Sequence, residues 1–136
     1  MITNMELKLI VIRTSDPERL ASFYSLLGLV FDHHKHGNSP FHYGATIGQT
    51  VLEIYPLAKG QIEPDKHLRL GFAVENFEKK IETLKQKQVP FAADPAQTEF
   101  GYLAVIIDPD GRKFELYKKW SENMYHSYAF IIQYNG

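Results

Sequence analysis

The chain contains two segments of the same pattern, about sixty residues apart, and each ends in a strand that carries a glutamate. Each copy begins with an apolar run, continues through a helical pattern and closes on an apolar segment around one acid, Val51-Leu52-Glu53-Ile54-Tyr55 or Lys113-Phe114-Glu115-Leu116-Tyr117. A single strand–helix–three-strand unit cannot bury both faces of its small sheet, so two units are expected to associate and enclose a cavity. We therefore expect the two glutamates to face a shared cleft.

Local signals give the limits of the elements. The first copy has a strand at 6–13, a helix from Asp16-Pro17 to a left-handed end at Gly28, and strands at 29–36, 41–47 and 50–56. After a polar linker at 57–66, the second copy has a strand at 67–74, a helix capped by Asn76, a strand from Phe91 and a hairpin of 102–107 with 112–118. The pattern predicts one α+β domain over 1–136. It has two tandem βαβββ modules, at about 6–56 and 67–118, in a bowl-like mixed sheet with helices outside, and a C-terminal extension at 119–136. The apolar stretch 128–132 is expected to add a strand or cover an interface.

Composition excludes several classes of function. The 136 residues suffice for one hydrophobic core, and a net charge of −1 gives no field that would attract nucleic acid. There is no cysteine, so disulfides, a thiolate nucleophile and thiolate metal ligands are ruled out. No apolar run is long enough to cross a bilayer and no signal pattern opens the chain. We expect a soluble cytoplasmic protein with no membrane or nucleic-acid partner.

The motifs resemble a known family. Thr14-Ser15-Asp16-Pro17, Phe23-Tyr24 and Leu27-Gly28-Leu29 in the first copy, with Asp108-Pro109-Asp110-Gly111 and Phe114-Glu115-Leu116 in the second, are similar to the vicinal oxygen chelate superfamily. It includes glyoxalase I, extradiol dioxygenases, fosfomycin-resistance proteins and bleomycin-binding proteins. The likeness covers about 6–118. It implies a homodimer with cavities shared across the interface, and four positions that converge on a metal ion, which fall here at Leu9, Glu53, Arg69 and Glu115.

Only half of those four positions can hold a metal. Leucine has no ligand atom, and arginine stays protonated and repels cations. We therefore predict no inherited metal site and no cofactor. A shift of two residues would exchange Arg69 for His67, on the same strand face, and would still leave Leu9 without a ligand atom. Three alternatives stay open for Arg69: an ion pair with the glutamates, a contact to an anionic ligand with Glu53 or Glu115 as catalytic acid or base, and a retained metal site.

Further residues are predicted to line the cavity. A tight turn at Gly48-Gln49 places His42 opposite Tyr55 and on the face of Glu53, while Lys113, Tyr102 and Tyr117 are expected to share the face of Glu115. His33, His34 and His36 precede His42, and alternation puts His33 on the opposite face from His34 and His36. These histidines are either ordinary surface and hydrogen-bonded residues or part of a nitrogen-rich metal site unrelated to the inherited one.

The function that follows is a metal-independent protein that binds a small organic molecule, of the glyoxalase/bleomycin-resistance type. The predicted ligand-binding residues are Glu53, Arg69, Glu115, Lys113, His42, Tyr55, Tyr102 and Tyr117. The alternative is a divalent-metal-dependent lyase, isomerase or dioxygenase, because such chemistry needs a Lewis acid to chelate neighbouring substrate oxygens. A structural or protein-binding role for the extension from Trp120 is the third possibility. Whether the protein is an enzyme is left open.

Overall fold

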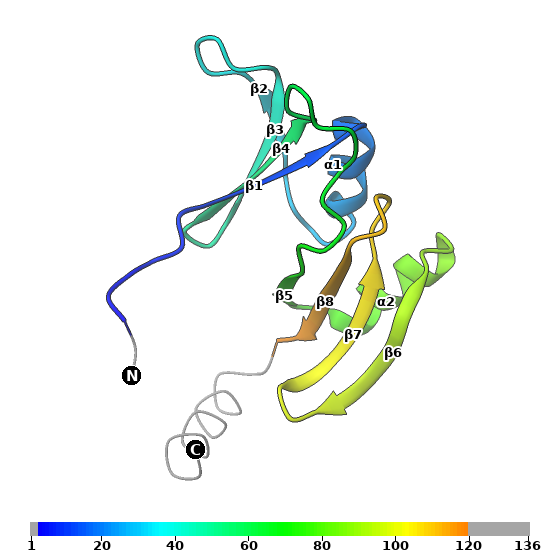
Figure 1. The fold of residues 1–136 in the computed structure, drawn as a ribbon. Helices are drawn as coiled ribbons and strands as arrows, with labels where there is room; N and C mark the ends of the chain where they lie inside the picture. Colours follow the sequence, from blue (N-terminus) through cyan, green and yellow to red (C-terminus); the bar gives the residue numbers. More distant parts are fainter. Residues whose placement is uncertain (1–2, 120–136) are drawn as a thin grey trace.

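The structure is a computed structural model that describes residues 3–119. In this part of the chain, two helices and eight strands follow one another in two equivalent series (Figure 1). The first series is β1 (Leu9–Thr14), α1 (Pro17–Ser25), β2 (Asp32–His34), β3 (His42–Ile47) and β4 (Thr50–Pro56). The second is β5 (Leu70–Val74), α2 (Phe77–Gln86), β6 (Phe91–Thr98), β7 (Gly101–Ile107) and β8 (Lys113–Lys118).

Each series forms a four-stranded sheet of the same topology. The strand order is β1-β4-β3-β2 in the first sheet and β5-β8-β7-β6 in the second. The first strand of each module pairs in parallel with the last, and the other pairs are antiparallel. The α+β class and the tandem βαβββ modules are thus confirmed. Each module forms its own sheet. The predicted strand at 29–36 is reduced to the three residues of β2.

The two helices begin differently. Asp16 caps α1, since its Oδ1 atom accepts a hydrogen bond from the backbone N–H of Arg19 at 3.1 Å, and Pro17 occupies the first turn. Asn76 precedes α2 in a left-handed conformation, with φ 53°, and its side chain makes no capping hydrogen bond. Asn76 is therefore the N-cap residue that the sequence predicts, but its side chain does not contribute a capping hydrogen bond. Gly28 has φ +101°, the left-handed end that the sequence predicts for the first helix.

One apolar core joins the two modules. Tyr24 on α1 is fully buried, and its ring contacts Phe72 of β5 at a centroid distance of 6.0 Å and Phe114 of β8 at 5.4 Å. Helix α1 of the first module therefore packs on the second sheet as well as on its own, and Figure 1 shows it beside the loop that joins β7 to β8. The core includes residues of both helices and of β1, β4, β7 and β8.

Alternation along the strands places both glutamates on the faces turned away from this core. Leu52 and Ile54, which flank Glu53, are buried in it, as are Phe114 and Leu116 on either side of Glu115. The two acids therefore lie on different sheets, each on the face opposite to the common core.

The predicted strand or interface cover at 128–132, in the extension from Trp120, lies outside the described residues. Within residues 3–119, neither helix combines the length and the apolar character that a membrane crossing requires.

Candidate functional site

Glu53 is the centre of the first candidate site. It lies on β4 between Val11 of β1 and Gly44 of β3, and its side chain is 12 % exposed. One carboxylate oxygen, Oε2, lies 3.0 Å from Nε2 of His42 and 3.9 Å from Nε2 of His36. Histidine side chains, and not Arg69, therefore surround this acid.

His42 lies where the sequence predicts it. The residue is fully buried, and its ring stacks on Tyr55 at a centroid distance of 4.2 Å and an interplanar angle of 9°. Its Nδ1 atom is 3.0 Å from the backbone carbonyl oxygen of Pro40. The imidazole, the phenol ring and the Glu53 carboxylate share one sheet face, which confirms the predicted grouping.

Glu115 is the centre of the second candidate site. Its Oε2 atom lies 2.9 Å from Nε of Arg69, and its Oε1 atom accepts a short hydrogen bond of 2.5 Å from the hydroxyl of Tyr117. Gly71 of β5 lies opposite Glu115, and a Cβ atom there would come within 3.3 Å of the Tyr117 ring. A glycine at this place lets the phenol lie close to the carboxylate.

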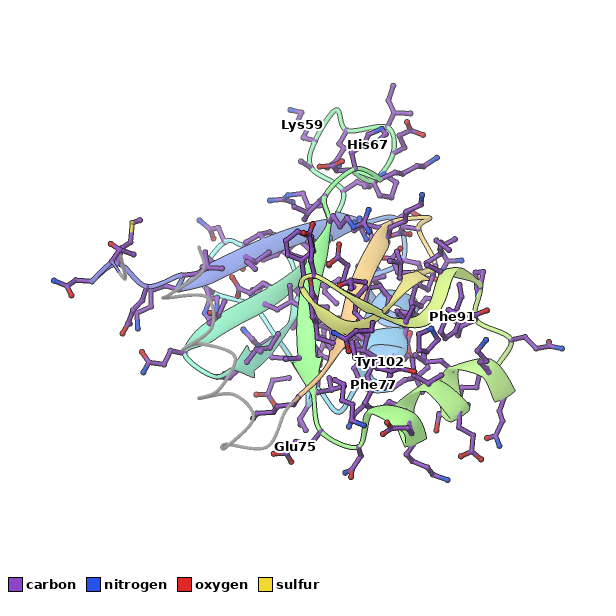
Figure 2. The ribbon with its side chains drawn as sticks, turned by 90° about the horizontal axis from the view of Figure 1, so that it is seen from below. Lys59, His67, Glu75, Phe77, Phe91 and Tyr102 are labelled. Atoms are coloured by element: carbon purple, nitrogen blue, oxygen red, sulfur yellow. The ribbon has the colours of Figure 1, made fainter. Side chains whose placement is uncertain are left out.

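The predicted positions of the inherited metal site can now be compared with the strand register. Val11 and Gly71 lie directly beside the two glutamates, while Leu9 and Arg69 lie two residues earlier on the same faces. Leucine, valine, glycine and arginine all lack a metal-ligating atom. His67, the predicted substitute, is exposed in the linker, where its backbone N–H donates to Asp65 (Figure 2).

The prediction for Tyr102 is wrong. In β7, Leu103 pairs with Tyr117 and Val105 with Glu115, so Tyr102 is on the opposite face. Its ring meets Phe77 of α2 at 5.6 Å, and the two side chains lie near each other in Figure 2. The predicted register was displaced by one residue, which moves every side chain of a strand to the other face.

Arg69 and Lys113 border a surface cavity of about 380 Å³. Its remaining lining residues are Lys66, His67, Leu68 and Gly111, so none of the described residues that line it is acidic. Lys113 lies two residues before Glu115 on the same strand face, as predicted. The arrangement can attract an anionic group.

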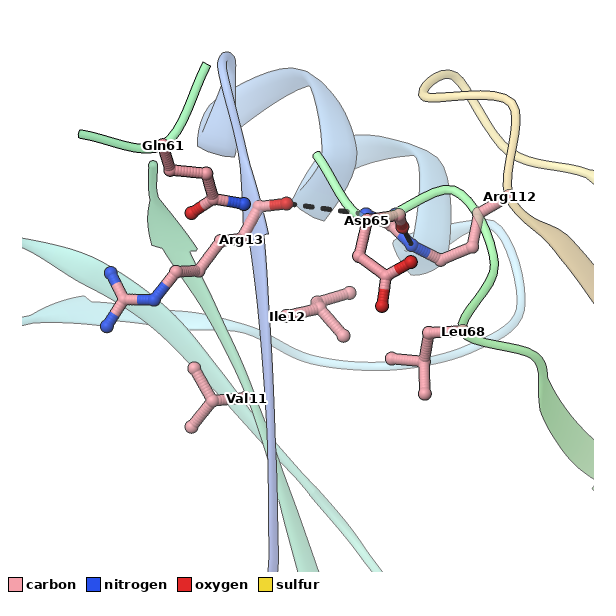
Figure 3. A pocket seen from close by; sticks show the side chains of 7 residues that line it. All are labelled: Val11, Ile12, Arg13, Gln61, Asp65, Leu68 and Arg112. Carbon is pink, nitrogen blue, oxygen red and sulfur yellow. Dashed lines mark hydrogen bonds between the residues drawn. The ribbon is translucent and has the colours of Figure 1, made fainter. Parts of the chain in front are cut away.

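A second cavity, of about 400 Å³, lies between β1 and the linker, and Figure 3 shows its lining residues. Neither of these two cavities is lined by Glu53 or Glu115. One wall of the second cavity is Arg112, whose Nε and Nη2 atoms donate to the backbone carbonyls of Asp65 and Arg13.

The sequence did not reveal the network around Arg112. This guanidinium is almost fully buried and lies 2.8 Å from Asp108, which also accepts a hydrogen bond of 2.7 Å from the Tyr24 hydroxyl. Burial, followed by the charge and hydrogen bond of Asp108, raises the pKa of Tyr24. Burial alone would lower the pKa of Arg112, but its contacts with Asp108 outweigh this and the net shift is upward. The sequence indicates only that residues 108–111 join the two strands of a hairpin, because a single arginine before a buried strand gives no periodic signal.

Comparison with protein families decides the classification. The model of the Glyoxalase/Bleomycin resistance protein/Dioxygenase superfamily matches residues 6–116. The chain belongs to this superfamily. A comparison of this superfamily member with curated protein sequences finds no match.

Solved structures of superfamily type share the fold. TnmS3, an antibiotic binding protein from Streptomyces sp. CB03234, has a TM-score of 0.70 and 20 % identity, over 88 % of this chain and 100 % of its own. A superfamily member from Sphaerobacter thermophilus DSM 20745 has a TM-score of 0.69 and 20 % identity, over 85 % and 98 %. The oxidase ChaP-H2 has a TM-score of 0.67 and 17 % identity, over 88 % and 98 %. At these identities the likeness concerns the fold alone.

Proposed function

We propose that this member of the superfamily binds a small organic molecule with an anionic group, and that binding does not require a metal at the four inherited positions. The observation that carries the proposal is the ion pair of Arg69 with Glu115, 2.9 Å apart, at two of those positions. A guanidinium there favours a carboxylate or phosphate group and disfavours a cation.

The cavity beside this ion pair supports the ligand class. Arg69 and Lys113 supply positive charge on one rim, and Tyr117 offers an aromatic surface on the same sheet face. Glu53, His42 and Tyr55 form an equivalent wall on the first sheet. In the proposed homodimer, the Glu115 wall of one copy faces the Glu53 wall of the other, and the ligand binds between them.

Tyr102 is left out of the proposed ligand-binding residues, because it packs on Phe77. The antibiotic-binding protein TnmS3 provides a precedent for ligand binding on this fold.

The proposal is tested by thermal melting of the full chain with a panel of small aromatic carboxylates and phosphates, with and without a chelator. We expect at least one compound to raise the melting temperature equally in both conditions. Arg69→Gln should weaken its binding about tenfold or more, the effect of losing one charge-assisted hydrogen bond of about 1.5–3 kcal/mol.

Lys79→Gln on the exposed face of α2 is the matched control, since it removes one positive charge far from the cavity. Equal affinity in Arg69→Gln and the wild type would contradict the proposed anion contact. Binding that disappears with the chelator would contradict the independence from metal and favour the second candidate function.

That second candidate is a metal-dependent lyase, isomerase or dioxygenase. The observation in its favour is the group of histidines around Glu53, which offers nitrogen ligands outside the inherited positions. The oxidase ChaP-H2 shows that the fold also occurs in an enzyme. Among residues 3–119, metal chemistry would depend on those histidines.

A further inference from the structure

We propose that His34, His36, His42 and Glu53 bind one divalent transition-metal ion. Each offers one ligand atom, and these four atoms lie within 4.8 Å of one another. Only Glu53 coincides with an inherited position. The proposed site shares Glu53 and His42 with the proposed ligand wall but involves neither Arg69 nor Glu115, so it adds a metal ion to the proposed function without using the anion contact.

The three rings converge from neighbouring elements of the first sheet. His34 ends β2, His36 follows in the loop, and His42 begins β3 opposite His34. Ring centroids are 4.4 Å apart for His34 and His42, 4.7 Å for His34 and His36, and 5.1 Å for His36 and His42. His33 lies on the other face, where its ring stacks on Tyr43 at 4.6 Å.

The hydrogen bonding of His42 leaves one nitrogen without a donor or acceptor partner. A carbonyl oxygen can only accept, so the contact with Pro40 places the proton on Nδ1. In the neutral ring the lone pair of Nε2 then faces the site. This atom is buried and has no hydrogen-bond partner among the described residues, although Oε2 of Glu53 is 3.0 Å away. Two electron-rich atoms at this distance repel unless a proton or a metal ion lies between them, and a metal bound to the neutral ring would be held by both atoms.

The contact of His42 with Pro40 is also the arrangement that orients a metal-binding histidine. Such ligands usually donate their second ring N–H to a carbonyl or carboxylate, which fixes the tautomer and the ring direction. Tyr55, stacked on the other side at 4.2 Å, holds the ring in place.

Gly44 provides the space for His34. A Cβ atom at this position would come within 3.0 Å of Cε1 of His34, tighter than most side-chain contacts. The imidazole therefore lies over bare backbone. A larger residue at position 44 would require the His34 ring to shift by a few tenths of an ångström relative to the other ligands.

The ligand set determines the class of ion. Three imidazoles and one carboxylate suit zinc, iron(II), cobalt, nickel or copper, while calcium and magnesium prefer sites made of oxygen atoms. His36 is 68 % exposed, so its ring can move to close the 3.9 Å gap to Glu53. The remaining coordination positions on that side are open to water or substrate.

The test uses the full chain, treated with a chelator, dialysed and titrated with Zn²⁺ by calorimetry and with Co²⁺ by visible absorption. We expect one ion per chain and a cobalt spectrum typical of nitrogen and oxygen ligands. We expect weaker metal binding, by about tenfold or more, in each of four variants: His34→Gln, His36→Gln, Glu53→Gln and Gly44→Ala. Loss of a hydrogen bond that only orients a metal ligand already weakens binding by about tenfold.

His33→Gln and His67→Gln are matched controls, because each removes an exposed imidazole outside the cluster. His36→Gln guards against misfolding, since its exposed side chain contributes little to the core. Absence of stoichiometric binding would overturn the proposal, as would binding that the four variants and the two controls affect equally. Anion binding at Arg69 should persist in His36→Gln, which separates the two proposals.

Discussion

Arg112 connects three parts of the chain through one buried guanidinium. Its donors reach the carboxylates of Asp108 and Asp110, the carbonyl of Asp65 in the linker and the carbonyl of Arg13 in β1. A buried charge is tolerated only when it is paired and its hydrogen bonds are made. The geometry meets both conditions, so loss of Arg112 would leave a buried carboxylate unpaired.

Arg112→Met should lower the free energy of unfolding by about 3–5 kcal/mol, the usual cost of removing one partner of a buried pair. Urea denaturation measures the change. Arg19→Met is the control, since Arg19 is 53 % exposed and lies 3.4 Å from Asp110, and should cost about 1 kcal/mol or less. Similar losses in the two variants would show that the buried network adds no stability of its own.

Tyr24 should make the fold sensitive to alkali. The raised pKa means that the folded protein keeps the phenol proton at a pH where the unfolded chain, with a pKa of about 10, has lost it. The unfolded state then binds fewer protons, so stability is fully present below pH ~10 and falls as pH rises above it. The slope from this group approaches about 1.4 kcal/mol per pH unit. Urea denaturation between pH ~9 and ~11 should show a shallower decline in Tyr24→Phe; parallel declines would refute the effect.

At the level of elements, the sequence was informative where the turn was short. Two residues, Gly48 and Gln49, join β3 to β4, and they fix the register that places His42 on Tyr55. The connection between β7 and β8 is longer, and its length does not fix the pairing of the two strands. The predicted register is displaced by one residue and therefore assigns Tyr102 to the face of Glu115. The α+β class and the duplicated modules followed from helix ends and apolar periodicity, which are local signals.

The contacts between elements were harder to predict. Alternation placed His34 and His36 on one face, but their approach to His42 depends on the curl of the loop and on the space above Gly44. The partners of the glutamates also depend on tertiary packing. An ion pair with one or both glutamates is one of three alternatives that the sequence leaves open for Arg69, and the residue contacts Glu115 while Glu53 is surrounded by histidines.

On the scale of the whole molecule, the outward faces of the sheets are incompletely covered. Leu9 and Val11 of β1 expose 52 % and 40 % of their surface on an edge strand, and Leu7 just before them is exposed as well. Apolar side chains along a free sheet edge favour association with another strand or sheet. This supports the homodimer proposed above.

Leu9→Lys should therefore convert a dimer into a monomer of 15.7 kDa, measured by size-exclusion chromatography with light scattering. The change places a charge in the proposed apolar interface, and half-exposed Leu9 contributes little to the core. Val30→Lys, at another exposed position in the connection between α1 and β2, should remain dimeric. A wild type that is already monomeric, or equal behaviour of the two variants, would argue against this interface.

The two glutamates stand at matching places in a repeated unit, yet different side chains surround them. Imidazoles gather around one, and a guanidinium and a phenol around the other. The two modules therefore share the same backbone fold but carry different chemical groups around their glutamates. In the proposed dimer, where a wall of one kind faces a wall of the other, a bound molecule would have a defined head and tail. Each half could change its specificity by substitution without altering the other.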